Sequence, residues 1–375
     1  MENPFEINPT FCFTLLGTFF IYLWTLPSRS ARLAVVLLGF GLRVACLRFM
    51  GGLGAYYGVR WISWGAFLGI ASLVVLAVQV FRSRPTGRQS LLHTFYAAAV
   101  FPLCSLLIGY TIPITTWLRP KTYDAFLLAF DAGLGFQPSF ALGRLMVHRP
   151  NLWGLTTSVY YALPLAVCVL YASCRLQRRQ PVAILPLVLS LMVIGFIQYG
   201  VFPAVGPEHA FQQAYPLHPP TLAQIALVPI TVPNEPRNCM PSLHLAAALV
   251  VWWNSRIWPR SGRLLAFLFL LATIFSTLAL GEHYLADLVV ALPFTLAFQG
   301  AWTTSIEFAN RARRRPLVWG VVLTVAWMVS LRYSLTLFLI SPAISWGLIL
   351  LTVIACMVLE ENLSVAARRP MTSPV

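Results

Sequence analysis

The chain has 375 residues, of which 58% are hydrophobic and only 10% are charged. Soluble globular proteins usually contain about 45–50% apolar and about 25% charged residues, and disordered chains are poor in hydrophobic residues. The composition therefore excludes an ordinary soluble enzyme and a disordered chain, and it predicts an all-α, polytopic transmembrane helix bundle. The net charge of +15 does not indicate nucleic-acid binding, because the arginines lie in short runs between apolar stretches, as cytoplasmic loops do.

Apolar runs long enough to cross a bilayer predict about eleven spans, at 11–27, 32–50, 61–81, 90–111, 153–174, 182–203, 242–255, 264–281, 285–304, 316–335 and 339–359. The arginines concentrate in alternate connections, so the positive-inside rule places the N-terminus outside and the C-terminus in the cytoplasm. The basic residues are nearly all arginines, which favours a bacterial inner membrane. The odd number of cysteines, seven, predicts neither a disulfide framework nor a cysteine metal site.

Two connections are long, at about 112–152 and 204–241, and the charge pattern places both outside. Long connections in a compact protein are usually functional. In the first, a helical face is predicted from the spacing of Phe126, Leu127, Phe130 and Leu134. We favour an amphipathic helix at the outer headgroups. The alternative is a helix that covers a site, with Asp124 or Asp131 contacting a hydroxylated acceptor.

The second long connection ends at Pro241-Ser242-Leu243-His244, where an apolar helix begins. Proline is favoured at the first helical position, so the next three N–H groups are expected to point out of the helix end. Such an end binds anions, phosphate above all, and Arg237 lies just upstream as a fixed cation. His244 would then lie beside the anion. Taken alone, the motif favours a simpler interpretation, a capped helix with a surface histidine.

A second motif, His283-Tyr284-Leu285-Ala286-Asp287, lies between two predicted spans. Residues four apart share a helical face, so Asp287 is expected to orient His283 and raise its basicity. A carboxylate near the start of an apolar span is usually functional, although an interfacial ion pair is the alternative. Two helices separate this motif from His244, so both face the same side, which favours chemistry. The other histidines lack a paired pattern and are expected to be structural or at the surface: His93, His148, His209 and His218.

Met240-Pro241-Ser242-Leu243-His244 and His283-Tyr284-x-x-Asp287 resemble the second and third motifs of the type 2 phosphatidic-acid phosphatase superfamily. Within it they are most similar to the inositolphosphotransferase branch, typified by fungal inositol phosphorylceramide synthase. The resemblance covers about 182–304. It implies a catalytic core of six helices at most, in 90–304, with further transmembrane helices in 1–89 and 305–375.

The resemblance also implies roles for single residues. His283 would be the nucleophile that forms a phosphohistidine, Asp287 its orienter, and His244 the acid that protonates the leaving group. Phosphate oxygens would be held by Arg237, Ser242 and Leu243. Apart from the resemblance, the candidates for substrate contacts are Arg119, Lys121, Asp124, Asp131 and Tyr284. The family needs no metal, so no metal and no other cofactor is expected.

The sequence departs from the phosphatase pattern at three places. Leu243 stands where that pattern has glycine, and Thr277 stands where it has an arginine six residues before the nucleophile. Pro203-Ala204-Val205-Gly206-Pro207 occupies the place of the first motif. The inositolphosphotransferase branch shows the same losses, so they favour a transferase, and they leave open which cations complete the phosphate site.

These observations predict an integral-membrane phosphotransferase that moves a phosphoryl group or phospho-headgroup between lipids at the extracytoplasmic face. Hydrolysis of a lipid phosphate or polyprenyl diphosphate is the alternative within enzymes. A lipid transporter or flippase is the alternative of another class, because Arg43 and Arg332 lie inside predicted spans. The expected partners are membrane lipids and not nucleic acid, and the oligomeric state is open.

Overall fold

The computed structural model describes residues 9–50, 62–149, 151–175 and 180–368. Helices make up almost all of this part of the chain, and one short two-stranded sheet accompanies them. The predicted all-α polytopic fold is thus confirmed. Eight described helices are long and apolar enough to cross a membrane, or up to ten spans if each of two bent helix pairs counts as one.

Each predicted apolar run carries helix, but two of these helices are short. α1 (Pro9–Leu23) has 15 residues and α12 (Leu243–Asn254) has 12, so the described spans number fewer than the expected eleven. Conversely, the predicted connection 112–152 holds a bent pair of helices, α6 (Asp124–Gly133) and α7 (Pro138–His148), at 87° to each other. Sequence periodicity indicated the first of these helices but not the second.

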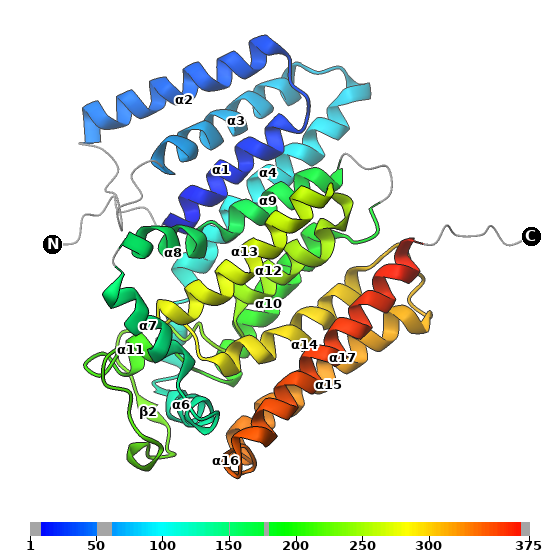
Figure 1. The fold of residues 1–375 in the computed structure, drawn as a ribbon. Helices are drawn as coiled ribbons and strands as arrows, with labels where there is room; N and C mark the ends of the chain where they lie inside the picture. Colours follow the sequence, from blue (N-terminus) through cyan, green and yellow to red (C-terminus); the bar gives the residue numbers. More distant parts are fainter. Residues whose placement is uncertain (1–8, 51–61, 150, 176–179, 369–375) are drawn as a thin grey trace, which may run out of the picture. The chain divides into compact units, whose positions relative to one another are not determined.

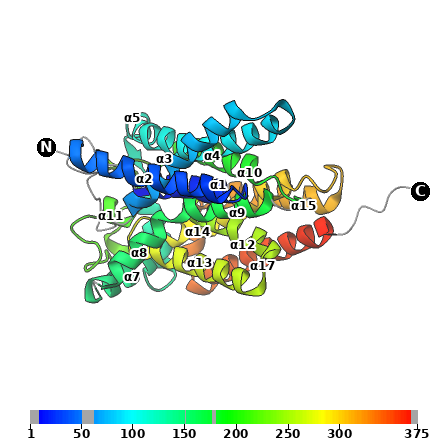
Figure 2. The same ribbon diagram turned by 90° about the horizontal axis from the view of Figure 1, so that it is seen from above.

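The chain folds as two compact units, one of 1–111 and 157–178 and the other of 112–156 and 179–375. This division differs from the predicted boundaries after residues 89 and 304. The first unit contains α1, α2 (Arg29–Met50), α3 (Ile62–Arg82), α4 (Pro85–Thr111) and α9 (Leu163–Arg175). Within it α1 packs against α3, α4 and α9 (Figure 2). α8 (Asn151–Tyr161) crosses the boundary between the units.

The second unit holds every residue of the predicted site. Its longer helices besides α6, α7 and α12 are α10 (Ile184–Val201), α13 (Arg260–Ala279), α14 (Leu285–Trp302), α15 (Arg311–Tyr333) and α17 (Pro342–Arg368). Its short elements are α5 (Ile114–Leu118), α11 (Pro207–Ala210), α16 (Thr336–Leu339), and the 3₁₀ turns η2 (Leu222–Gln224) and η3 (Ser255–Ile257). The strands β1 (Lys121–Thr122) and β2 (Ile230–Thr231) pair antiparallel and join the two long connections.

α14 is the central helix of the second unit. It packs against α10, α12, α15 and α17, and Figure 1 shows it running beside α15 and α17. In the apolar stretch of α14, 72% of the residues are buried, compared with 33% in α10 and in α15. α14 therefore runs through the protein interior. α6 is buried in the same core, where Phe130 contacts the rings of Trp327 and Phe338.

Candidate active site

His283 lies in a tight turn between α13 and α14. Gly281 ends α13 with a φ of 72°, the left-handed conformation that glycine adopts at a helix C-terminus without a side-chain penalty. The chain then folds back, so that Glu282 and His283 both donate their N–H groups to the carbonyl of Thr277 at 3.2 Å. Thr277, which occupies the position of the family's arginine, therefore supports the turn through its backbone. The carbonyl of His283 accepts a hydrogen bond from the Ser139 hydroxyl at 2.7 Å.

Asp287 orients His283 from the third position of α14. One carboxylate oxygen, Oδ2, accepts the Tyr284 N–H at 2.8 Å and lies 3.5 Å from His283 Nδ1. The contact therefore arises from helix capping, since His283 precedes the helix, and not from the shared helical face that the sequence predicted. Cys239 donates its thiol to the same oxygen at 2.7 Å. With Nδ1 turned to Asp287, the ring carries Nε2 on its opposite side.

His244 lies next to His283. Their ring centroids are 5.7 Å apart and the ring planes cross at 64°. His283 is buried, with 1% of its surface exposed, whereas His244 in the first turn of α12 is half-buried. The structure thus brings together the three predicted catalytic residues, His244, His283 and Asp287, from positions that are about 40 residues apart in the chain. One phosphoryl group can contact both imidazoles at this separation.

Asp124 holds the segment after α10 against the histidine turn. Its carboxylate is buried and accepts the N–H groups of Val205 and Gly206 at 3.0–3.2 Å. It also accepts the Tyr284 hydroxyl at 3.0 Å. The proposed first-motif replacement, around Gly206, is therefore fixed beside the site by a carboxylate of α6. Asp124 and Tyr284, expected to contact substrate, are instead occupied with each other.

Asp131 accepts backbone hydrogen bonds from the start of α14, as Asp124 does from Val205 and Gly206. Its carboxylate is 1% exposed and accepts the N–H of Leu285 at 2.9 Å and that of Ala286 at 3.4 Å. A carboxylate at a helix N-terminus satisfies orphan donors and interacts favourably with the helix dipole. Leu127 and Phe130 of the same helix are fully buried. This corrects the predicted amphipathic helix at the outer headgroups, because the helix of Asp124–Gly133 is a buried part of the core. Contact of Asp124 or Asp131 with an acceptor stays a prediction.

Arg237, which was expected to bind phosphate, contacts backbone carbonyls in the structure. Its side chain is fully buried and donates to the backbone carbonyls of Arg119, Pro120 and Val232 at 2.8 Å and also to that of Glu235. All three guanidinium nitrogens are therefore engaged in tying two connections together. A part for Arg237 in phosphate binding stays a prediction.

The N-terminus of α12 also differs from its prediction. Ser242, and not Pro241, borders the helix as its N-cap, with its hydroxyl accepting the Leu245 N–H at 3.3 Å. The Ser242 N–H donates to the carbonyl of Asp287 at 3.3 Å. This donor therefore joins the two histidine motifs and does not point outward to an anion.

Leu243 places its side chain against α10. A Cβ added at Gly195 would lie 2.5 Å from Leu243 Cδ2, so the two helices approach closely here. The leucine that replaces the family's glycine thus fills space between α12 and α10, and its expected part in phosphate binding stays a prediction.

The remaining predicted contacts, Arg119 and Lys121, are exposed. Arg119 donates from Nε to the carbonyl of Gly200 at 2.8 Å, and Lys121 lies in β1 opposite Thr231. Both lie in the long connections, and a role in binding substrate phosphate is still a prediction for each of them.

A cluster of charged residues around His209 was not predicted. His209 Nδ1 lies 3.3 Å from Glu235 Oε2, and its Nε2 lies 3.8 Å from Glu282 Oε2. Burial lowers the pKa of His209, but the carboxylates of Glu282, Glu235 and Glu208 outweigh it and raise that pKa to about 9. The sequence carries one signal for this cluster, because the dipeptide Glu-His occurs at 208–209 and again at 282–283.

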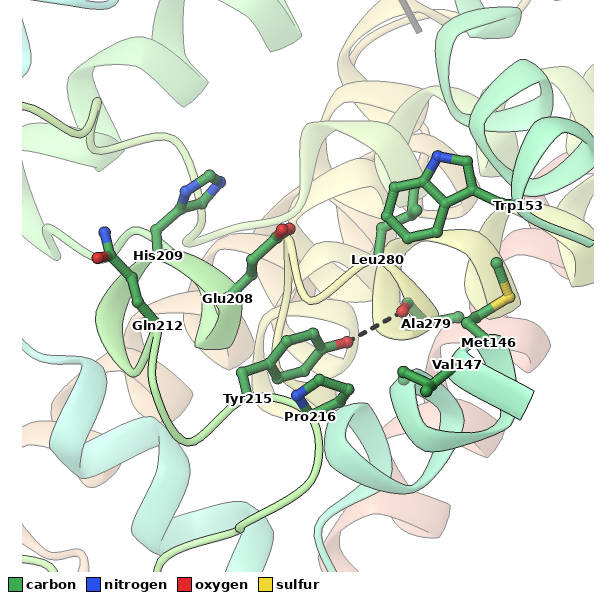
Figure 3. Close-up of a pocket in the computed structure, with 11 residues that line it drawn as sticks. Met146, Val147, Trp153, Glu208, His209, Gln212, Tyr215, Pro216, Ala279 and Leu280 are labelled. Carbon is green, nitrogen blue, oxygen red and sulfur yellow. Dashed lines mark hydrogen bonds between the residues drawn. The ribbon is translucent and has the colours of Figure 1, made fainter. Parts of the chain in front are cut away.

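This cluster borders a cavity of about 590 Å³. Figure 3 shows Glu208 and His209 on one side of it, with Trp153, Met146 and Leu280 opposite and Tyr215 between. The hydroxyl of Tyr215 donates to the carbonyl of Ala279 at 2.9 Å. The cavity wall therefore ends only a few residues before His283 in the chain.

Two groups in the described part of the chain have the donor atoms of a metal site. Cys239, His283 and Asp287 form one, and Glu208, His209 and Glu282 form the other. In the first, Asp287 Oδ1 is buried and has no hydrogen-bond partner. The Cys239 thiol contacts both Asp287 Oδ2, at 2.7 Å, and His283 Nδ1, at 3.5 Å.

Residues 125–301, which contain both histidine motifs, match a family model described as the PAP2 superfamily. No curated protein and no solved structure matches the chain significantly. Members of the superfamily are phosphatases or phosphotransferases. The match supports the resemblance that the two histidine motifs indicated, because the matched segment carries His244, His283 and Asp287.

Proposed function

We propose that this protein is an integral-membrane lipid phosphotransferase that works through a phosphohistidine on His283. The observation that carries the proposal is the arrangement of three side chains, with Asp287 3.5 Å from His283 Nδ1 and the His244 ring 5.7 Å from the His283 ring. Phosphoryl transfer through a covalent intermediate requires a nucleophile, a group that orients it, and an acid that protonates the leaving group.

The reaction has two steps. Nε2 of His283 attacks the phosphorus of a lipid-linked phosphate, a P–N bond forms, and the P–O bond to the leaving group breaks. His244 gives a proton to the departing oxygen. An acceptor hydroxyl then loses its proton to His244 and attacks phosphorus, the P–N bond breaks, and His283 is restored. Asp287 stabilises the imidazolium character of His283 throughout.

The molecule that accepts the phosphoryl group from His283 distinguishes a transferase from a phosphatase. The departures at Leu243 and Thr277 resemble the inositolphosphotransferase branch, which supports transfer of a phospho-headgroup to a second lipid. Water as the acceptor would give the runner-up activity, hydrolysis of a lipid phosphate or polyprenyl diphosphate. The superfamily match is compatible with both.

The structure gives less support to a transporter than the sequence does. The two intramembrane arginines that motivated it both lie over aromatic rings. Arg43 lies 3.7 Å from the ring centroid of Trp64, and Arg332 lies 4.5 Å from that of Tyr123. Such cation–π contacts offset the burial of a guanidinium without a transported ion or lipid.

We further propose that the site faces the extracytoplasmic side of a bacterial inner membrane. The multi-pass character follows from the long apolar helices. The orientation rests on the arginine distribution, and the choice of membrane on the arginine bias.

The test is turnover by purified full-length protein with phosphatidylinositol, ceramide, phosphatidic acid and undecaprenyl diphosphate. We expect His283→Ala to reduce product formation below detection while the protein still inserts and purifies normally. His93→Ala, an exposed histidine outside the second unit, is the matched control and should retain activity. Wild-type-like turnover by His283→Ala would exclude the proposed nucleophile.

A further inference from the structure

The acidic residues of this basic chain are concentrated beside one cavity. Of only 11 acidic residues against 26 basic ones, three surround His209, namely Glu208, Glu235 and Glu282. The 11 residues that line the adjacent cavity of about 590 Å³ include no lysine or arginine. In a chain with a net charge of +15, the cavity therefore borders a cluster of three carboxylates around one imidazole.

Glu208 is the carboxylate that this cavity presents. Figure 3 shows it directed into the space that Trp153 and Leu280 close from the other side. Its backbone N–H is held by the Gly281 carbonyl at 3.0 Å, but within the described residues its carboxylate makes no hydrogen bond or ion pair. Burial, together with the charges of Glu282 and Glu235, raises the pKa of Glu208 although His209 lowers it. A bound cation would offset this excess of negative charge.

The cavity also supplies aromatic surface. Trp153 and Tyr215 both line it, and their rings lie on different sides of the space in Figure 3. Aromatic faces attract organic cations, and aromatic cages with a nearby carboxylate are the usual way that proteins bind quaternary ammonium groups. A neutral polyol gains nothing comparable from these rings.

A metal ion fits this cavity less well than an organic cation. The imidazole of His209 faces a carboxylate on each nitrogen, Glu235 at Nδ1 and Glu282 at Nε2. Both ring nitrogens are thus paired with carboxylates, so a metal ion could bind the ring only by displacing one of these pairs. The single positive charge of a protonated His209 offsets only part of the charge of Glu235 and Glu282, so the cluster that includes Glu208 keeps an excess of negative charge.

We propose that this cavity binds the ammonium group of a substrate, either a lipid headgroup that carries a primary or quaternary ammonium or the corresponding free aminoalcohol. The proposal rests on the proposed phosphotransferase function for its use, because it would place the ammonium-bearing part of a substrate beside the histidine turn. Glu282 links the two places, since it faces His209 and is followed directly by His283. The ligand class is set by the carboxylate and the two rings, and not by the resemblance to inositolphosphotransferases.

The test uses a probe pair that differs only in charge. Radiolabelled choline and the neutral isostere 3,3-dimethyl-1-butanol are offered to the full-length His283→Ala protein in detergent, and binding is followed by equilibrium dialysis. We expect choline to bind, the isostere to fail to compete, and Glu208→Gln to weaken choline binding by about tenfold or more. Trp153→Leu should weaken it also. Glu307→Gln, an exposed carboxylate elsewhere, should leave binding unchanged.

Native mass spectrometry separates the two ligand sources. The delipidated His283→Ala protein is offered an equimolar mixture of phosphatidylcholine, phosphatidylethanolamine, phosphatidylinositol and phosphatidic acid. Glu208-dependent retention of the two ammonium lipids identifies a headgroup site, and choline binding without such retention identifies a site for the free aminoalcohol. Binding that requires added divalent metal, equal competition by the neutral isostere, or no dependence on Glu208 would overturn the proposal. Because His283 is absent throughout, these results do not depend on catalysis, whereas loss of the phosphotransferase function would appear only in the turnover assay.

Discussion

At the residue level, a single carboxylate oxygen contacts three groups of the candidate site. Asp287 Oδ2 accepts from the Tyr284 backbone and the Cys239 thiol and faces His283 Nδ1. The same atom therefore caps α14, holds the loop before α12 and fixes the imidazole tautomer. Such sharing makes the orientation of His283 depend on the start of a buried helix, which holds it more rigidly than a surface ion pair would.

Asp287→Asn is expected to lower turnover by roughly 10²–10⁴-fold. The amide keeps the size of the side chain, but it cannot stabilise an imidazolium as a carboxylate does. Steady-state kinetics with the substrate identified for the wild type measure the loss, and circular dichroism checks the helix content. Cys239→Ala removes only the weak thiol donor, so it should lose less than about tenfold. Activity of Asp287→Asn within twofold of wild type would contradict the assigned role.

The charge cluster at His209 predicts a pH dependence of stability. The pKa of His209 is raised from 6.5 to about 9 in the folded protein, so its protonation favours the folded state. This contribution is fully present below pH 6.5 and is lost as the pH rises through about 9. We expect the thermal midpoint of the wild type to fall between these values more than that of His209→Gln. Parallel midpoint curves for the two proteins would show that the cluster does not contribute.

At the level of elements, the sequence predicted helices well and their tertiary roles poorly. Long apolar runs predict helices because a chain that crosses a bilayer needs about 20 consecutive apolar residues. All eleven runs contain helix in the structure. The pairing of His244, His283 and Asp287 could be predicted because each lies at a motif that borders a helix. Asp124 and Asp131 could not be placed, since their partners lie more than 80 residues further along the chain. The contacts of Arg237 could not be predicted for the same reason, because two of its four carbonyl acceptors belong to the other long connection.

Gly206 illustrates how closely the elements around the site approach. Its φ is 95°, and an added Cβ would lie 2.5 Å from the carbonyl oxygen of Glu282. Gly206→Ala therefore strains two backbone segments, and we expect it to destabilise the fold by about 1–3 kcal/mol and to displace the histidine turn. Thermal unfolding and turnover should both fall. Gly200→Ala, in α10 with open space around it, is the control and should change neither.

At the scale of the whole molecule, basic residues and the candidate site are predicted to lie on opposite sides of the membrane. The basic residues gather in the connections predicted to be cytoplasmic, whereas the acidic cluster at His209 and both histidine motifs lie at connections predicted to be extracytoplasmic. The helices of the first unit and α15 and α17 of the second carry no chemistry that we can assign. One link among them is clear: Arg256 in η3 is paired with Glu360 and Glu361 of α17.

The orientation can be tested with reporter fusions. If the positive-inside rule holds, alkaline phosphatase fused after Thr221, in the second long connection, should be active. The same reporter fused after Asn310, next to the arginine run that starts α15, should be inactive, and a fluorescent protein fused there should emit. The reversed pattern would put the histidines on the cytoplasmic side and would remove the extracytoplasmic assignment.

The turn at Gly281 has a thermodynamic consequence. Two neighbouring residues of this turn face different sites. Glu282 faces His209 beside the cavity, and His283 faces Asp287. Glu282 also feels the charges of His283 and His244, which lower its pKa, as His209 does, against the effect of burial. A change of charge on His283 is therefore expected to change the charge balance at the acidic cavity. By linkage, the proposed phosphorylation of His283 and the proposed binding in the cavity are expected to change each other's free energy by the same factor.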